Sequence, residues 1–341
     1  MSERPYFSIG VTTFDRRDLL IETVSSILAQ SFGDFEVVVG NDNPGRPLTL
    51  QSLGIDDPRV RILNRVANLG EIGNMNELLA QSRGRYFTWL ADDDLYAPNF
   101  LQAVRDAHER FGPVSCVFSS YVSGATCELG RVAYEQSMLL PSGRDFLRDY
   151  LDRKIQTLGC CGVFDIQYLR NAGGVVRLGN GFSPYSDNLL AIEAGALDRV
   201  CYIAAPLLFF RTHPDSISFT SPDVNAYFTA QQDLCARALA VFRLPQLRSN
   251  LQECLYQLLS HWCITFMFHV MRRSRNRPSV STLITYLRFV QRNAVELDAR
   301  HRAGLALVGM RLVGEHWIYL LRNGLSRAWM STARNLRIGG R

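Results

Sequence analysis

The stretch YFTWLADDD, residues 86–94, decides the fold, because it joins a short apolar run to three consecutive carboxylates. Residues 86–91 have the length and the aromatic and aliphatic content of a buried strand. The run stops at Asp92, Asp93 and Asp94, and Pro98 follows, whose fixed φ suits the first turn of a helix. The stretch therefore predicts a strand, an acidic loop and a helix.

The same pattern precedes it three times. Residues 6–12, 35–40 and 60–63 are apolar runs of strand length, and the first and third lead into apolar residues at helical spacing. Asp15 is predicted to cap the first of these helices, and Asn68 introduces the helix after the third strand. This alternation predicts an α/β fold with a mostly parallel central sheet covered by helices.

Polar residues occur where each predicted strand ends. In open α/β sheets the ligand crevice lies outside the carboxyl ends of the strands, so these residues should meet at one rim. They are Thr13, Asp15, Asn41, Asp42, Asn68, Asp92, Asp93 and Asp94. Their convergence from four places in the sequence predicts a binding site.

The three aspartates have two interpretations. They form either a solvated acidic turn or a site for a divalent cation, which would relieve the repulsion between adjacent carboxylates. Carboxylate oxygens suit Mg²⁺ or Mn²⁺, and these ions keep positions open for diphosphate oxygens. The buried strand directly before them favours the cation.

Composition limits the class of protein. The 341 residues are 47% hydrophobic, and eight cysteines show no CxxC pair or zinc-finger spacing. Charges and a proline near the N-terminus argue against a signal peptide, so we expect a reducing, cytoplasmic location. Walker and GxGxxG motifs, which would indicate a kinase or a dehydrogenase, are absent from the sequence.

Charge divides the chain into two parts. Residues 1–224 have a net charge of about −7 and residues 225–341 one of about +12, and only one basic residue, Lys154, is a lysine. Strand patterns end near residue 225, and helices are predicted at 224–242, 245–272, 280–297 and 300–322. We therefore expect a catalytic domain over 1–224 and a basic helical region over 225–341.

Three stretches together resemble the family-two glycosyltransferases of the GT-A fold. They are SIGVTTFDRRDLLIETVSSILAQSF (8–32), FEVVVGNDNPG (35–45) and NLGEIGNMNELLAQSRGRYFTWLADDDLYAPNFL (68–101), and the resemblance extends to about residue 218. It implies an inverting enzyme that moves a sugar from a nucleotide-diphosphate-sugar, with UDP favoured, to an acceptor hydroxyl. The implied setting is assembly of a bacterial surface polysaccharide or glycolipid.

The resemblance also implies roles for single residues at the rim. Thr13, Asp15, Asp42 and Asn68 would bind the donor nucleotide, and Asp92 the ribose or the sugar. Asp93 and Asp94 would bind Mn²⁺ or Mg²⁺. The pattern departs from the family at two places, because Ala91 stands where many members have the first acid and Asn41 where many have a second aspartate.

Two later motifs complete the implied site. SPYSDNLL, residues 183–190, resembles the family's base motif and makes Asp187 the catalytic base, although its local sequence equally predicts a helix cap. FRTHPDSIS, residues 210–218, resembles the family's closing segment and makes Arg211 a diphosphate ligand and His213 a third metal ligand. A histidine after a strand is otherwise typical of a structural or solvated role.

The basic helical region has three readings. Residues 255–271 are apolar but too short and too often interrupted to span a bilayer. Arginines at 272, 273, 275 and 277, with Trp317 and Trp329 further on, suit a helix on an anionic membrane surface. The alternatives are core helices with solvated arginines or pairing into a homo-oligomer, whereas nucleic acid is not an expected partner because the acidic N-terminal part would repel it.

The sequence thus predicts a metal-dependent glycosyltransferase at the inner face of the cell membrane, acting on a glycan or a lipid-linked glycan. A nucleotidyltransferase would use the same sheet and acids, but it needs a glycine-rich loop after the first strand, where this chain has TTFDRRD. A non-catalytic scaffold that binds nucleotide-sugars is the other alternative, and Ala91 is its support.

Overall fold

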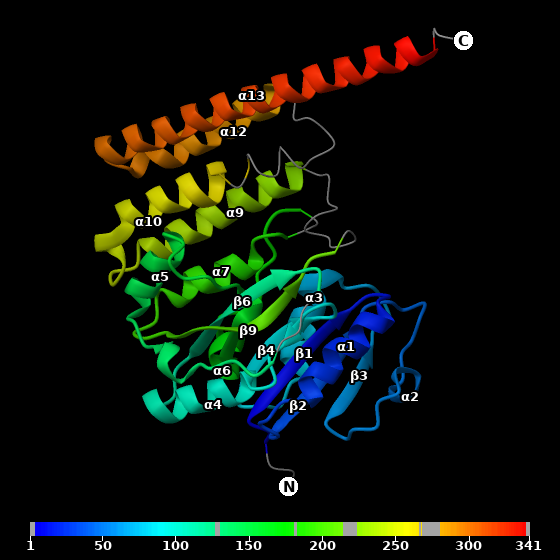
Figure 1. The fold of residues 1–341 in the computed structure, drawn as a ribbon. Coiled ribbons are helices and arrows are strands. Elements are labelled where there is room, and N and C mark those ends of the chain that lie inside the picture. Colours follow the sequence, from blue (N-terminus) through cyan, green and yellow to red (C-terminus); the bar gives the residue numbers. More distant parts are fainter. Residues whose placement is uncertain are drawn as a thin grey trace.

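A computed structural model describes residues 4–126, 130–180, 183–213, 224–265, 267 and 280–338, without the side chains of 280–283, 316, 319, 320 and 322–338. A central sheet has helices on both faces, and the C-terminal helices are stacked beyond one of these layers (Figure 1). The predicted α/β fold with a helical C-terminal region is confirmed.

The sheet contains nine strands among the described residues, in the order β3-β2-β1-β4-β8-β6-β9-β5, with β7 paired to β9. Their bounds are β1 Phe7–Thr13, β2 Phe35–Asn41, β3 Val60–Asn64, β4 Tyr86–Ala91, β5 Leu95–Tyr96, β6 Cys116–Gly124, β7 Met138–Leu139, β8 Gly162–Asp165 and β9 Cys201–Arg211. The first four strands are parallel, as are β6 and β9, while the short pairings of β8, β5 and β7 are antiparallel.

The register of the parallel strands explains why polar residues meet at one rim. Thr13 pairs with Asn41 across β1 and β2, and Thr12 pairs with Ala91 across β1 and β4. The residue after each strand therefore leaves the sheet at the same height. Asp42 and Asp92 accordingly flank the end of β1, which places the predicted polar residues at the carboxyl edge of the sheet.

Helices cover the two faces according to the alternation of strand side chains. Phe87 and Trp89 of β4 point into one core, and Tyr86 and Leu90 into the other. Helices α1 and α4 cover the second core, whereas α3, α5, α6 and α7 cover the first. The bounds are α1 Arg17–Leu28, α2 Leu50–Leu53, α3 Gly70–Gln81, α4 Phe100–Phe111, α5 Gly143–Leu151, α6 Ile166–Asn171 and α7 Ser186–Ala194, with short 3₁₀ turns η1 Glu135–Ser137 and η2 Gly159–Cys161.

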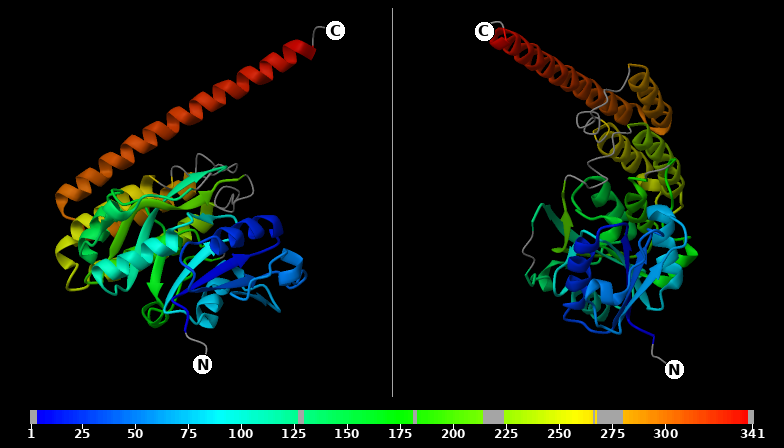
Figure 2. Two further views of the ribbon diagram at one scale, coloured as in Figure 1. Left: turned by 60° about the horizontal axis from the view of Figure 1, so that its bottom comes forward. Right: turned by 90° about the vertical axis from the view of Figure 1, so that its right-hand side faces the viewer.

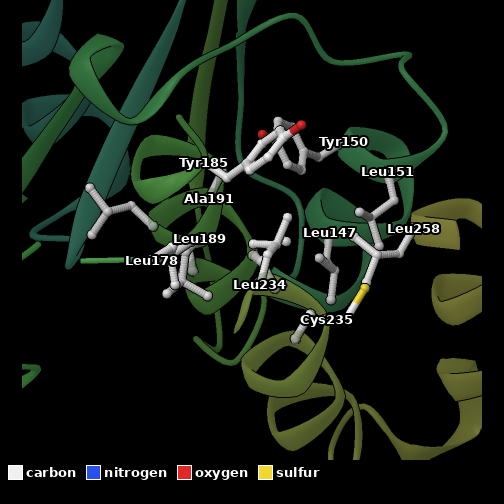
Figure 3. Close-up of a cluster of buried hydrophobic side chains, with 14 of the residues drawn as sticks. Leu147, Tyr150, Leu151, Leu178, Tyr185, Leu189, Ala191, Leu234, Cys235 and Leu258 are labelled. Carbon is white, nitrogen blue, oxygen red and sulfur yellow. The ribbon is translucent and has the colours of Figure 1, made fainter. Parts of the chain in front are cut away.

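The C-terminal helices extend the first core rather than forming one of their own. Leu234 and Cys235 lie against Leu147 and Leu189, so that helices from both parts of the chain share one apolar cluster (Figure 3). The bounds are α9 Val224–Phe242, η3 Arg248–Asn250, α10 Leu251–Gln257, a π-helical turn η4 Leu258–Thr265, α12 Val280–Asn293, η5 Ala294–Glu296 and α13 Ala299–Ile338.

Helix α13 is the longest element, with 40 residues. Its first part packs on α10 and η4, and the rest projects past the other helices (Figure 2). Leu307, Met310, Trp317, Ile318 and Leu321 are each more than half exposed on it. Over the described residues, no helix has both the length and the apolar character that crossing a membrane requires.

Three sequence expectations about helix ends are wrong. Arg16, not Asp15, occupies the N-cap position of α1, and Asp15 adopts a left-handed φ of 61° instead. Helix α4 begins at Phe100 with Asn99 at its cap, so Pro98 lies before the helix. The helix predicted over 245–272 begins only at Leu251 and turns π-helical at Leu258. Asp15 pairs with Arg46 instead of capping the helix, and helix ends one or two residues from their predicted places are common because local propensity sets them only weakly.

Candidate active site

Thr13 and Asp92 join the ends of β1 and β4. The hydroxyl of Thr13 donates a 2.6 Å hydrogen bond to Oδ2 of Asp92. The backbone N–H of Asp42 donates to the carbonyl oxygen of Thr13 at 3.0 Å, and Oδ1 of Asp42 accepts the N–H of Leu69 at 2.8 Å. The ends of three strands are thereby tied together, through side chains between β1 and β4 and through the backbone between β1 and β2.

Asn68 and Asp15 lie at the margins of this group. Oδ1 of Asn68 accepts the N–H of Gly70 at 2.7 Å and fixes the turn into α3. Asp15 instead turns to Arg46, with Oδ1 and Nη1 2.5 Å apart, and it does not line the cavity described below. Four of the five residues predicted to bind the donor at this rim, Thr13, Asp42, Asn68 and Asp92, are brought together around one space.

The three aspartates have different surroundings. Oδ2 of Asp93 lies 2.8 Å from Nη1 of Arg16 and 2.9 Å from Nε2 of His213. Oδ1 of Asp94 accepts the backbone N–H of Arg211 at 2.9 Å. Burial raises the pKa of Asp92 to about 6, against the hydrogen bond from Thr13 and the charge of Arg16, which lower it. Burial and the neighbouring Asp93 raise the pKa of Asp94.

Arg211 is held by the acidic loop and by α1. Its Nε donates to the carbonyl oxygen of Asp93 at 2.8 Å, and Nη2 lies 2.6 Å from Oε2 of Glu22. These contacts tie the end of β9 to the loop after β4. His213 reaches Asp93 because it follows Arg211 by two residues on the same extended segment.

The donor atoms at Asp93 suit a divalent cation that also binds a diphosphate. Within the described residues, no three histidine, cysteine or acidic side chains converge on a single point as a complete ligand set. Oδ2 of Asp93 and Nε2 of His213, 2.9 Å apart, would be two adjacent ligands for such an ion. Mg²⁺ is commonly bound by one or two carboxylates together with substrate phosphates and water, so two protein ligands fit such an ion.

Two cavities adjoin at this edge of the sheet. The larger, of about 310 Å³, is lined by Thr13, Asp42, Asn68, Asp92 and their neighbours. The smaller, of about 140 Å³, is lined by Asp94, Cys160, Asp187 and residues of the sheet and of α3. Thr12, Glu71 and Ala91 line both. Four of the residues expected to bind a donor, Thr13, Asp42, Asn68 and Asp92, thus face one cavity, and the expected base faces the other.

Asp187 lies in the first turn of α7 without capping it. The N-cap position belongs to Tyr185, and no side-chain capping bond forms there. Burial raises the pKa of Asp187 to about 6. A carboxylate with such a pKa is mostly ionised at neutral pH and can accept a proton there.

Gly159 explains how Asp187 fits into this place. A Cβ atom on Gly159 would lie 2.8 Å from both the backbone oxygen and Oδ1 of Asp187. The small residues of the stretch GCCG, 159–162, are compatible with either close packing or room for an acceptor. At Gly159 the reason is close packing against the candidate base.

Glu71 and Arg16 were missed by the sequence reasoning. Glu71 is exposed at the mouth of the cleft, yet desolvation by the surrounding protein, together with the charges of Asp187 and Asp93, raises the pKa of Glu71 to about 7. Glu71 follows Asn68-Leu69-Gly70 at the rim, which is a signal that could have identified it. Arg16 could have been found as the next charged residue after Asp15, although its hydrogen bonds to Asp92 and Asp93 depend on the loop geometry.

Comparison with known proteins finds a family match over just under half of the chain. Residues 8–165 match the family described as glycosyl transferase family 2. The GalNAc(5)-diNAcBac-PP-undecaprenol beta-1,3-glucosyltransferase of Campylobacter jejuni is 39% identical over 93 residues, 26% of this chain and 30% of that protein. An uncharacterized glycosyltransferase of Haemophilus influenzae is 29% identical over 107 residues, 30% of this chain and 33% of that protein. The chain spans about a third of the length of these curated relatives.

A solved structure gives a match of nearly the full chain. Residues 1–349 of S. aureus TarS, crystallised with UDP-GlcNAc, superpose with a TM-score of 0.63 at 13% identity, covering 91% of this chain and 89% of that one. At this identity the match shows the fold alone. The fold it shows is of the GT-A type followed by a helical region.

Proposed function

Because this chain carries a family 2 glycosyltransferase domain, we propose that it is an inverting enzyme that transfers a sugar from a nucleotide-diphosphate-sugar to an acceptor hydroxyl. UDP is the favoured nucleotide. The observation that carries the proposal is the pair of adjoining cavities, one lined by Thr13, Asp42 and Asp92 and the other by Asp187. A donor in the first and an acceptor in the second would meet at their common wall.

The larger cavity is proposed to bind the donor nucleotide. Asp42 and Asn68 offer acceptors for the N–H and O–H groups of a base and a ribose, and Asp92 offers a carboxylate held by Thr13. Asp15 stands at its margin, paired with Arg46 of a separate loop, and would act on the donor only indirectly through this pair. Arg211 would support the diphosphate side through its bonds to the acidic loop.

Asp93 and His213, with Asp94 beside them, would hold the Mn²⁺ or Mg²⁺ ion. When bound, such an ion neutralises the negative charge that develops on a departing diphosphate. Arg16 now occupies one oxygen of Asp93 and would move aside when the ion and the donor bind. Because Arg16 lines the larger cavity, its guanidinium would then meet a phosphate oxygen of the donor.

The proposed transfer is a single displacement. The acceptor oxygen forms a bond to C1 of the sugar, its proton passes to a carboxylate oxygen of Asp187, and the bond from C1 to the diphosphate oxygen breaks. The electron pair of that bond leaves with the nucleoside diphosphate. Attack from the side opposite the leaving group inverts the configuration at C1.

The test is nucleotide release from UDP-, GDP- and dTDP-sugars with Mn²⁺ or Mg²⁺, for the wild type and for Asp187→Asn. Metal-dependent release that the variant loses supports the glycosyltransferase. Donor binding without turnover in the wild type would indicate a scaffold instead, and pyrophosphate release from a nucleoside triphosphate and a sugar phosphate would indicate a nucleotidyltransferase. If the wild type neither binds any of these donors nor releases nucleotide from them, the proposal is overturned.

The acceptor is proposed to be a glycan or a lipid-linked glycan, at the inner face of the cell membrane. The name of the Campylobacter jejuni relative describes a substrate linked to undecaprenol through a diphosphate. In this chain, support comes from the net charge of about +12 over residues 225–341 and from exposed Trp317, Ile318 and Leu321 on α13. The arginines at 272, 273, 275 and 277, which belong to the same proposal, lie outside the described residues.

The proposed roles of the two parts of the chain follow their net charges. Residues 1–224 would contain the chemistry, and residues 225–341 would contact the anionic surface or a second copy of the chain. Helix α13 favours the surface over a second copy, because Glu315 is its only acidic residue among seven arginines, and two such helices side by side would repel each other.

A further inference from the structure

Glu71 lines both cavities, at the place where they adjoin. It lies in the first turn of α3, directly after Gly70, whose φ of 70° turns the chain into the helix. Three residues line both cavities, namely Thr12, Glu71 and Ala91, and Glu71 is the only one of them with an ionisable side chain. A carboxylate therefore stands where the cavities meet.

The charges around Glu71 come from both sides of the cleft. Asp187 and Asp93 raise its pKa, whereas Arg177 and Arg16 lower it. Among the described residues, none forms a hydrogen bond with the side-chain carboxylate of Glu71. A carboxylate in a cleft without such a bond has both oxygens available to a ligand.

The geometry of a transfer determines what reaches this position. The nucleotide of the donor would lie with Thr13, Asp42 and Asp92 in the larger cavity, and C1 of its sugar must come within reach of an acceptor hydroxyl beside Asp187 in the smaller one. The sugar that is transferred must then lie across the wall that the cavities share. This step rests on the proposed function.

We propose that Glu71 accepts hydrogen bonds from hydroxyl groups of the transferred sugar and contributes to the choice of that sugar. A carboxylate has two oxygens that accept hydrogen bonds from two hydroxyls at once, which makes it sensitive to their orientation. Glu71 is exposed to solvent in the open cleft, and a bound sugar would cover it. A sugar that lacks the matching hydroxyl, or directs it elsewhere, would then leave the covered carboxylate unpaired.

The experiment compares the affinity for UDP with the affinity for UDP-sugars, measured by calorimetry with Mg²⁺ on the full chain. The variants are Glu71→Gln, which keeps the shape, and Glu71→Ala, with Glu109→Gln on the outer face of α4 as the matched control. UDP-glucose, UDP-galactose, UDP-GlcNAc and UDP-GalNAc serve as donors. Hydrolysis rates with the same four donors give the selectivity, and circular dichroism checks folding.

In both Glu71 variants the affinity for the preferred UDP-sugar should fall by about tenfold or more, while the affinity for UDP stays within about twofold of the wild type. The ratio of hydrolysis rates between epimeric donors should shift toward unity. Equal losses for UDP and UDP-sugar, or no loss for either, overturn the role of Glu71 but leave the proposed function standing. Failure of the wild type to bind any nucleotide-sugar overturns both.

Discussion

Gly159 lies against Asp187 so closely that a single added carbon at Gly159 would stand 2.8 Å from a carboxylate oxygen of Asp187. Contacts under 3 Å of this kind force one partner to move. The position of the candidate base therefore depends on a residue that has no chemistry of its own.

Replacing Gly159 by alanine should lower turnover while sparing the donor site. The added carbon displaces Asp187 or the η2 turn, and overpacking of this kind costs roughly 1–3 kcal/mol of unfolding free energy. Steady-state kinetics and urea denaturation measure the two effects. Gly33→Ala is the control, because a Cβ atom there meets nothing within 4 Å. Wild-type turnover in Gly159→Ala would show that Asp187 tolerates displacement.

Asp187→Asn should reduce turnover by a factor of about 10² to 10⁴, the usual contribution of a general base, and should leave donor affinity unchanged. The wild-type rate should rise with pH and level off above the pKa of about 6, since the base acts only when ionised. A rate profile from pH 5 to pH 8 checks both points. A variant that kept the wild-type rate and profile would exclude Asp187 as the base.

The same substitution should stabilise the protein at neutral pH. The folded state raises the pKa of Asp187 from 3.8 to about 6, so it binds the proton more tightly than the unfolded state does. Stability linked to this group is complete below pH 4 and is lost as the pH rises through 6. The unfolding free energy of Asp187→Asn, relative to wild type, should thus be near zero at pH 4 and on the order of 2 kcal/mol higher at pH 7. Urea denaturation at both pH values tests the sign, and an advantage that is larger at pH 4 contradicts it.

Asp93→Ala should remove the gain in melting temperature that UDP with Mn²⁺ gives the wild type, because the ion loses a ligand next to the diphosphate.

Arg16→Ala should melt lower than wild type without ligands, because Asp92 and Asp93 lose their cationic neighbour, yet it should still respond to Mn²⁺. Thermal shift measures all of these. Asp57→Ala, which breaks only a pair with Arg59, is the control. An unchanged Mn²⁺ response in Asp93→Ala would remove Asp93 from the metal site.

Vesicle binding should depend on the exposed face of α13. Trp317→Ser with Leu321→Ser should reduce pelleting with anionic vesicles, and truncation after Glu315 should nearly abolish it, since each arginine removed contributes about 1 kcal/mol near such a surface. Leu139→Ser, which is equally exposed on β7, is the control. Co-sedimentation at low and high salt with anionic and neutral vesicles gives the readout. If the wild type pellets equally with anionic and neutral vesicles, the exposed face of α13 does not bind an anionic surface.

Sequence alone predicts the first four strands, β1 to β4, to within a residue at each end, because their apolar runs are bounded by polar turns at the carboxyl edge. It also predicts α9 at its observed bounds. The antiparallel strands β5, β7 and β8 have two to four residues each, which is too short for an alternation pattern. These three strands form because other segments of the same chain lie beside them and supply the hydrogen-bond partners.

For the candidate site, residue identities were more predictable than contacts. The sequence indicated a cluster containing Asp92, Asp93 and His213, and these residues do lie together, although their roles stay predictions. It gave no sign that Asp94 would bond the backbone of Arg211, or that Arg211 would turn toward Glu22. Such contacts depend on where β9 returns beside β6, a pairing between strands that lie some 80 residues apart in the chain.

A buried chain of hydrogen bonds connects the start of α7 to the helices that follow. Nε2 of Gln231 donates to the hydroxyl of Tyr185 at 2.8 Å, and the hydroxyl of Tyr286 donates to Oε1 of Gln231 at 3.0 Å. Tyr185 stands two residues before Asp187, so this corner of the cleft is finished only when α9 and α12 are present. On the ribosome, a nascent chain that already contains every proposed catalytic and metal-binding residue still lacks these partners. The order of synthesis thus delays a complete active site until most of the helical region has emerged.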